Sequence, residues 1–267
     1  MGIWAIGDVQ GCFAELEQLL FEIDFNKNSD QVWFCGDLLG KGPDSEKVLE
    51  LIQSLETSAI VVLGNHDLNF LALCHGGGER SKDDRLDTLL SSPKREQHCN
   101  WLRKQKIFHY DPELHMALVH AGVDWQWSLQ DCRRLAHELE ELLRSDSYAT
   151  ILPLCYGDQP LTWHESLSFL DRTRCLINVF TRLRCYNQQL QYELLYNKDE
   201  DAPGLIPWFQ IPERKMIHTP IVFGHWSRLR QKKWHNAHNL DYSCVYGGEL
   251  FALRLDEHAT ARVKCRR

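Results

Sequence analysis

The 267-residue sequence contains no apolar run that approaches the ~20 residues needed for a transmembrane helix. Its N-terminus also lacks the basic region, long apolar segment and small-residue cleavage site of a signal peptide. We therefore expect a soluble, cytoplasmic protein that has no membrane partner. No feature of the sequence indicates a dedicated protein partner either.

Cysteine pairs of the C-x-x-C type are absent, although the chain contains ten cysteines. Several lie in apolar stretches such as VWFCGD and NFLALC, so we interpret them as reduced core residues rather than as disulfides or zinc ligands. The net charge is −7, and the basic residues are scattered along the sequence rather than gathered into a stripe. This argues against a dedicated nucleic-acid-binding protein, and any anionic substrate must be attracted locally, by metals or a few placed cations.

The first third of the chain repeats one arrangement, in which a short apolar run leads to a polar turn and then to a helical pattern. IWAI leads to GDVQG, VWFC leads to GDLLGKGPDS, and AIVVL leads to GNHD. ELEQLLFEI and EKVLELIQSL have apolar residues at three- and four-residue spacing, which predicts amphipathic helices packed on a sheet. WSLQDCRRLAHELEELLR predicts a third helix, with a capping box formed by Ser128 and Asp131.

Two later apolar runs end in histidine, HMALVH at His120 and PIVFGH at His225. Ligands gather at the carboxyl ends of strands in α/β architectures, so we expect these turns to meet at one edge. A lone Gly-Asp after a strand is usually only a turn. Together, however, the strand ends supply carboxylate, amide and imidazole donors, which predict a site for two divalent ions. The five side chains are Asp8, Asp37, Asn65, His120 and His225.

The motifs GDVQG, GDLLGKG, GNHD, VHAG and GHW, in this order, resemble the calcineurin-like metallophosphatase superfamily. The segments YGDQP, FTRLRC and PWF, with the sequence around the motifs, resemble more narrowly the bacterial symmetrical bis(5'-nucleosyl)-tetraphosphatases. The resemblance runs from Ile3 to about Leu255. It implies the hydrolysis of diadenosine tetraphosphate to two molecules of ADP.

The resemblance also implies a fold. We expect an α/β sandwich of two mixed sheets flanked by helices, as in the metallophosphatases. Residues 1–267 would form a single domain, in which about 128–214 is a cap-like insertion of helices and loops.

The resemblance assigns the ligands to two divalent ions, with Mn²⁺ expected first and Co²⁺ or Mg²⁺ as alternatives. Asp37 would bridge the ions, and Asp8 would hold the first, with Gln10 as a candidate ligand beside it. The second ion would be held by Asn65, His120 and His225. A hydroxide activated by the ions would attack a central phosphorus of the substrate.

His66 follows Asn65 directly, and the resemblance makes it the general acid that protonates the leaving oxygen. The polyphosphate would be bound by Lys41, Arg182 and Arg184, since guanidinium groups match phosphate oxygens. We expect one of these two arginines to face away from the substrate. In the loop after GNHD, Lys82 and Arg85 are further candidates.

Three motifs depart from the superfamily pattern. Gln10 stands where the first motif usually has histidine, and Ser227 stands where many members have a second histidine after Gly-His. The first ion would then be held by oxygens alone, which favours Mn²⁺ or Mg²⁺. Gly40 and Lys41 replace the Asp-Arg pair that orients the catalytic histidine in protein phosphatases, which leaves Asp67 as one candidate partner of His66.

Several alternatives stay open at this point. The chain could be a protein Ser/Thr phosphatase of the same fold, a binding module without catalysis, or an enzyme that removes nucleoside-tetraphosphate caps from RNA 5' ends. The nucleobases of the substrate could stack on aromatic side chains, although aromatics more often serve packing. The candidates for stacking are Trp125, Trp127, Tyr156, Trp163 and Trp208.

Overall fold

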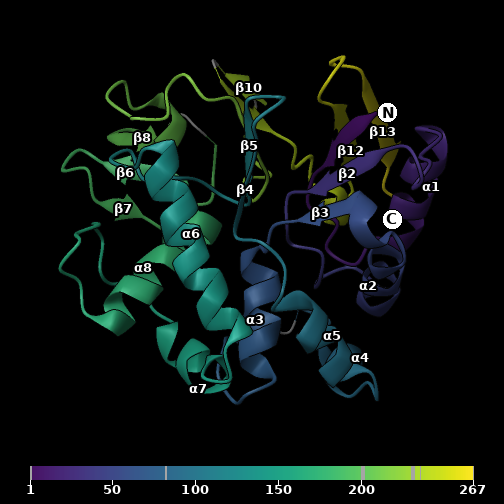
Figure 1. The fold of residues 1–267 in the computed structure, drawn as a ribbon, viewed down its shortest axis with the longest axis horizontal. Coiled ribbons are helices and arrows are strands. Elements are labelled where there is room, and N and C mark those ends of the chain that lie inside the picture. The colour runs from purple at the N-terminus through teal and green to yellow at the C-terminus, as the bar shows by residue number, and fades with distance from the viewer. Residues whose placement is uncertain (1, 82, 200–201, 230–231, 235, 267) are drawn as a thin grey trace.

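Two five-stranded mixed sheets lie face to face in the computed structural model, which describes residues 2–81, 83–199, 202–229, 232–234 and 236–266 (Figure 1). In the first sheet β1, β2 and β3 are parallel, and β12 and β13 add antiparallel strands at the side of β1. The order of its strands is β13 (Thr260–Lys264), β12 (Glu249–Arg254), β1 (Ile3–Ile6), β2 (Gln31–Phe34) and β3 (Ala59–Val61).

The second sheet has three parallel strands at its centre, β11, β9 and β5, and an antiparallel strand at each edge. Its order is β10 (Lys233–Trp234), β11 (Ala237–Asn239), β9 (Ile221–Phe223), β5 (Met116–Val119) and β4 (Phe108–Asp111). The apolar runs that end at His120 and His225 are therefore neighbouring parallel strands, as the sequence predicts.

The first sheet has a separate hydrophobic core on each face, because successive side chains of a strand point to opposite faces. Ala5 and Trp33 face the second sheet and pack there with Leu118 and Val222. Ile6 and the other alternate residues belong to the larger core under the helices. Both faces of β1 and β2 are buried, which explains why their sequences are continuous apolar runs.

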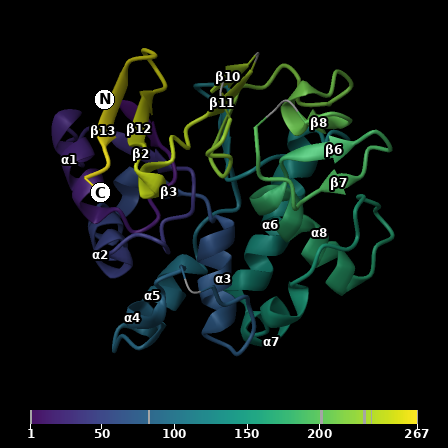
Figure 2. The same ribbon diagram turned by 180° about the vertical axis from the view of Figure 1, so that it is seen from behind.

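Helices cover the outer faces of both sheets. α1 (Phe13–Glu22) and α2 (Ser45–Ser54) flank the first sheet, and α6 (Leu129–Arg144) flanks the second at β4 (Figures 1 and 2). Below β3 the chain continues into α3 (Asn65–Leu73), α4 (Asp87–Leu90) and α5 (Arg95–Leu102). The predicted sandwich of two mixed sheets flanked by helices is confirmed.

The segment 128–214 contains α6, α7 (Tyr148–Ile151), α8 (Phe169–Arg182) and a three-stranded sheet. That sheet has the order β7 (Tyr192–Glu193), β6 (Cys185–Asn187) and β8 (Leu205–Pro207), and it lies beyond the second sheet (Figure 2). α6 begins at the predicted capping box, in which Ser128 Oγ accepts from the Asp131 N–H at 3.1 Å. Since α6 packs on β4, the first part of this segment is a layer of the sandwich, and a cap role for the rest stays a prediction.

Short 3₁₀ helices complete the fold at Glu56–Ser58, Leu152–Cys155, Trp208–Gln210 and Cys244–Tyr246. All ten cysteines are free and nine are buried, in agreement with their interpretation as reduced core residues. None of the helices in the described part of the chain has the length and apolar character needed to cross a bilayer.

Candidate metal centre

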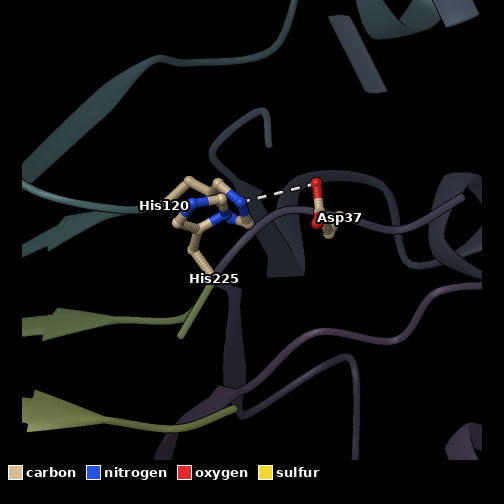
Figure 3. Close-up of side chains that lie close together, drawn as sticks. All are labelled: Asp37, His120 and His225. Atoms are coloured by element: carbon tan, nitrogen blue, oxygen red, sulfur yellow. Dashed lines mark ion pairs between the residues drawn. The ribbon is translucent and has the colours of Figure 1, made fainter. Parts of the chain in front are cut away.

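The five predicted donor side chains meet where strands of both sheets end. Asp8, Asp37 and Asn65 follow β1, β2 and β3, which belong to the first sheet. His120 and His225 follow β5 and β9 of the second sheet, and Figure 3 shows both imidazole rings beside the carboxylate of Asp37. One ligand atom from each of the three residues in that figure lies within 4.8 Å of the others.

Glycines allow the backbone to approach the two carboxylates. A Cβ on Gly224 would lie 1.9 Å from Asp8 Oδ1, and a Cβ on Gly64 would lie 2.2 Å from Asp37 Oδ1. Any side chain at either position would collide with a carboxylate oxygen. The glycines of the GHW and GNHD motifs therefore serve the geometry of the centre directly.

The hydrogen bonds of His120 define its tautomer. Nδ1 lies 2.7 Å from the carbonyl oxygen of Cys35, so this nitrogen carries the proton and donates it. Nε2 then presents a lone pair to two further electron-rich atoms, Asp37 Oδ1 at 3.4 Å (the dashed line in Figure 3) and Asn65 Oδ1 at 3.2 Å. Three lone-pair donors that face one another fit a divalent cation placed between them.

His225 is oriented in a similar way. Its Nε2 lies 3.2 Å from the carbonyl oxygen of Arg182, which leaves Nδ1 as the coordinating nitrogen. Its ring centroid is 5.0 Å from that of His120, and its backbone adopts a φ of +63°. Burial, with the positive charge of Arg184, lowers the pKa of His225 well below its usual range. The neutral imidazole that a metal needs is therefore the favoured form.

Oxygen atoms dominate the other side of the centre. Both oxygens of Asp8 lie 3.1 Å from the backbone nitrogen of His225. The amide nitrogen of Gln10 donates to Asp37 Oδ2 at 3.4 Å, and the role of Gln10 as a metal ligand stays a prediction. Asp8, Gln10 and Asp37 line one cavity together with Ser227, the residue that stands where many superfamily members have a second histidine. This concentration of oxygen atoms is suited to bind hard divalent cations.

Sequence reasoning missed Asp241, a buried carboxylate that lines the cavity with Asp8. Burial is the largest cause of the raised pKa of Asp8, and the charges of Asp241 and Asp37 follow. Such crowding of carboxylates is unfavourable without a cation and is relieved by one. The signal in the sequence is weak, because Asp241 follows a three-residue strand and carries no glycine motif.

His66 lies beside this centre on the first turn of α3. Its backbone N–H donates to Asp37 Oδ1 at 2.9 Å, and its Nε2 is 3.9 Å from Asp37 Oδ2. Burial lowers the pKa of His66, while Asp37 and Asp84 act in the opposite direction. Asp67 has another role, because its carboxylate accepts from the N–H groups of Leu38 at 3.0 Å and Gly64 at 2.9 Å and so fixes the turn before α3.

The candidate substrate cations divide into three groups. Lys41, whose Nζ hydrogen-bonds to the Tyr246 hydroxyl, and Arg184 line the main cavity of about 340 Å³. Arg182 instead lines a neighbouring cavity of about 190 Å³, and the expectation that one of the two arginines faces away from the substrate stays a prediction. Arg85 is exposed and lines neither cavity, and Lys82 lies outside the described residues.

The aromatic candidates for nucleobase stacking are also separated by the fold. Trp127, Trp163 and Trp208 are buried in the core, and Trp125 lines neither cavity. Tyr156 lines the cavity of about 190 Å³, next to His66. One of the five aromatic side chains is therefore placed to meet a ligand at the centre.

Comparisons with known proteins identify the family of this chain. The family model described as calcineurin-like phosphoesterase matches residues 1–175. A protein of Marinomonas sp. (strain MWYL1) named bis(5'-nucleosyl)-tetraphosphatase, symmetrical, is 40% identical to this chain, and the match covers 99% of this chain and 98% of that protein. A protein of the same name from Cellvibrio japonicus is 41% identical, with 99% of both chains covered. A crystal structure described as a candidate diadenosine tetraphosphatase is 26% identical, with a TM-score of 0.66 and coverage of 98% of this chain and 93% of that chain.

Proposed function

Because the chain belongs to the calcineurin-like phosphoesterase family, and within it to the symmetrical bis(5'-nucleosyl)-tetraphosphatases, we propose that it hydrolyses diadenosine tetraphosphate to two molecules of ADP. The resemblance drawn from the motifs is confirmed by these relatives. One observation carries the proposal: His120 Nε2, Asn65 Oδ1 and Asp37 Oδ1 direct lone pairs toward one another where the strands of both sheets end. This arrangement is suited to bind a metal ion.

We assign the ligands to two ions as the family resemblance implies. Asp37 would bridge the ions, and Asn65, His120 and His225 would hold the second, which the contacts of His120 Nε2 with Asn65 and Asp37 support. Asp8 would hold the first ion, with Gln10 as a candidate ligand, and Asp241 adds a carboxylate to the same cavity. When bound, two divalent ions would supply an activated water and withdraw charge from the phosphoryl oxygens. Mn²⁺ is our first candidate, because a mixture of oxygen and imidazole ligands suits it.

His66 provides the proton for the leaving nucleotide. Its Nε2 points toward the centre, 3.9 Å from Asp37 Oδ2, and the bond between its backbone N–H and Asp37 Oδ1 fixes the turn on which it lies. Transfer of this proton to the departing oxygen avoids the release of an unprotonated leaving group. Lys41 and Arg184 neutralise the phosphates that extend through the main cavity.

Product analysis tests the function most directly. We expect the purified protein with Mn²⁺ to convert diadenosine tetraphosphate to ADP alone, as measured by chromatography of the products. Release of AMP and ATP would contradict the symmetrical cleavage. Hydrolysis of phosphopeptides without turnover of the dinucleotide would favour the protein-phosphatase alternative. The same assay with Co²⁺ and Mg²⁺ ranks the three ions.

Other expectations from the sequence stay proposals. Removal of nucleoside-tetraphosphate caps from RNA would use the same bond and the same residues, and a capped RNA oligonucleotide tests it. A cytoplasmic location can be tested by cell fractionation. The absence of a dedicated protein partner is tested by the elution volume of the purified chain in the presence of a cell extract.

A further inference from the structure

The cavity of about 190 Å³ adjoins the metal centre on the far side of His66. Asn65 and His66 line both this cavity and the main one, so the imidazole of His66 stands at the junction of the two. We call the smaller cavity the Tyr156 pocket. Its other walls include Leu68, Glu79, Tyr156, Ile177 and Asn178.

The Tyr156 pocket offers an aromatic and aliphatic surface. Tyr156 comes from the segment after the 3₁₀ helix at Leu152–Cys155, Leu68 from α3 and Ile177 from α8. Leu68 and Ile177 are buried, and Tyr156 is half-buried. A planar ring can stack on a tyrosine face in such surroundings, whichever base it belongs to.

The charges of the two cavities differ in sign. In the Tyr156 pocket the guanidinium of Arg182 is already engaged, by Asp158 Oδ1 at 2.8 Å and Asn178 Oδ1 at 2.9 Å. Glu79 and Asp84 add carboxylates to its walls. A phosphate would meet net negative charge there, whereas a neutral ring with amino groups would meet hydrogen-bond acceptors.

The main cavity has the opposite character once two divalent ions are bound. Its lining includes the cations Lys41, Arg184 and Arg228, and the charges of its carboxylates would be balanced by the ions. The chain of phosphates therefore belongs in the main cavity and not in the Tyr156 pocket.

We propose that the Tyr156 pocket binds the nucleobase of the nucleotide that leaves, an inference that rests on the proposed function. His66 protonates the departing oxygen, so the leaving half of the substrate lies on the side of His66 that faces away from the ions. Asn65 and His66 line the pocket as well as the main cavity, and its aromatic and aliphatic walls offer a surface on which a base can stack. The two identical ends of the dinucleotide are thus bound in unlike surroundings.

Two substitutions remove the pocket by different means. Tyr156→Leu takes away the stacking face but keeps an apolar side chain. Ser81→Trp adds bulk at an exposed position on the pocket wall. Ser91→Trp is the matched control, because Ser91 is also exposed and lies at the end of α4, outside both cavities.

We expect both pocket variants to lower kcat/KM for diadenosine tetraphosphate by about 10- to 100-fold, the range observed for loss of base stacking. Cleavage of inorganic tetraphosphate, which carries the same four phosphates without bases, should change less than about twofold. Ser91→Trp should behave like the wild-type protein with both substrates. The affinity of the Mn²⁺-loaded protein for ADP, measured by calorimetry, should fall in the pocket variants and not in the control.

The outcomes separate the two proposals. If the wild-type protein produces ADP and both pocket variants keep its kcat/KM for the dinucleotide, the base-binding role is wrong and the proposed function stands. An equal loss with inorganic tetraphosphate would also overturn the role, because it would indicate damage to the centre. If the wild-type protein produces no ADP, the proposed function fails, and unchanged ADP affinity in the variants would then overturn the pocket by itself.

Discussion

The two sheets of the sandwich contribute chemically different halves to one centre. The first sheet supplies Asp8, Asp37 and Asn65, which form an oxygen half together with the Asp241 carboxylate that follows β11. The second sheet supplies the imidazole half, His120 and His225. Imidazole nitrogens are softer ligands than carboxylate oxygens, so the two halves differ in the ions that they favour. The strand ends of both sheets thus meet at one centre, whose oxygen half and imidazole half differ in chemistry.

The second shell of ligands differs between the halves as well. Each imidazole is held by a backbone carbonyl, Cys35 for His120 and Arg182 for His225, which fixes the nitrogen that faces the centre. The carboxylates of the oxygen half instead crowd one another, and this contributes to the raised pKa of Asp8. The imidazole half is therefore organised before a metal arrives, whereas the oxygen half depends on the metal to relieve repulsion.

Asp37→Asn should have the largest effect, because Asp37 is assigned as a ligand of both ions. Removal of its charge weakens the bridge between two cations, and we expect turnover to fall on the order of 10⁴-fold. Metal content, measured by mass spectrometry after dialysis, should fall from two ions per chain. Asp146→Asn, at an exposed position after α6, is the control and should keep both ions. Full metal occupancy in Asp37→Asn would contradict the bridging role.

His66→Asn separates catalysis from metal binding. His66 lies beside both halves and is assigned as a ligand of neither, so we expect two bound ions and turnover reduced by ~10²–10⁴-fold. Metal stoichiometry and single-turnover kinetics measure the two quantities on the same sample. Loss of an ion in this variant would show that His66 is a ligand and not the general acid.

Asp241→Asn tests the oxygen half alone. The substitution keeps the size of the side chain but removes one of the crowded carboxylate charges near Asp8. We expect the affinity for the more weakly bound ion to fall by ~10-fold, the scale of supporting ligands, while the second ion stays in place. Mn²⁺ titration followed by electron paramagnetic resonance distinguishes the two sites. Equal weakening of both ions would show that the halves are not independent.

The fold and the meeting of the strand-end residues could be predicted from the sequence, because the carboxyl ends of parallel strands lie at one edge of a sheet. Asp8, Asp37, Asn65, His120 and His225 each follow an apolar run, and the sandwich with its two mixed sheets is confirmed. Their roles as ligands remain a prediction, now supported by the geometry.

The positions of several other side chains depend on tertiary packing and could not be predicted from the sequence. Asp241 carries no motif and reaches the centre only because β11 pairs with β9. Among the aromatic side chains, burial in the core separates Trp127 and Trp208 from Tyr156, and composition alone contains no such information. Likewise, Arg182 and Arg184 are two residues apart but line different cavities because α8 ends between them.

Gln10→His should have the smallest effect and is the sharpest probe of the difference between the halves. It gives the oxygen half an imidazole at a side chain that already lies 3.4 Å from Asp37. A softer donor should raise the activity with Co²⁺ relative to Mg²⁺ by about a few-fold, without a change in the number of ions bound. Gln18→His, on α1 and outside both cavities, is the control for an added histidine. The ratio of kcat/KM with the two ions is the measurement, and an unchanged ratio in Gln10→His would mean that residue 10 does not set the metal preference of this half.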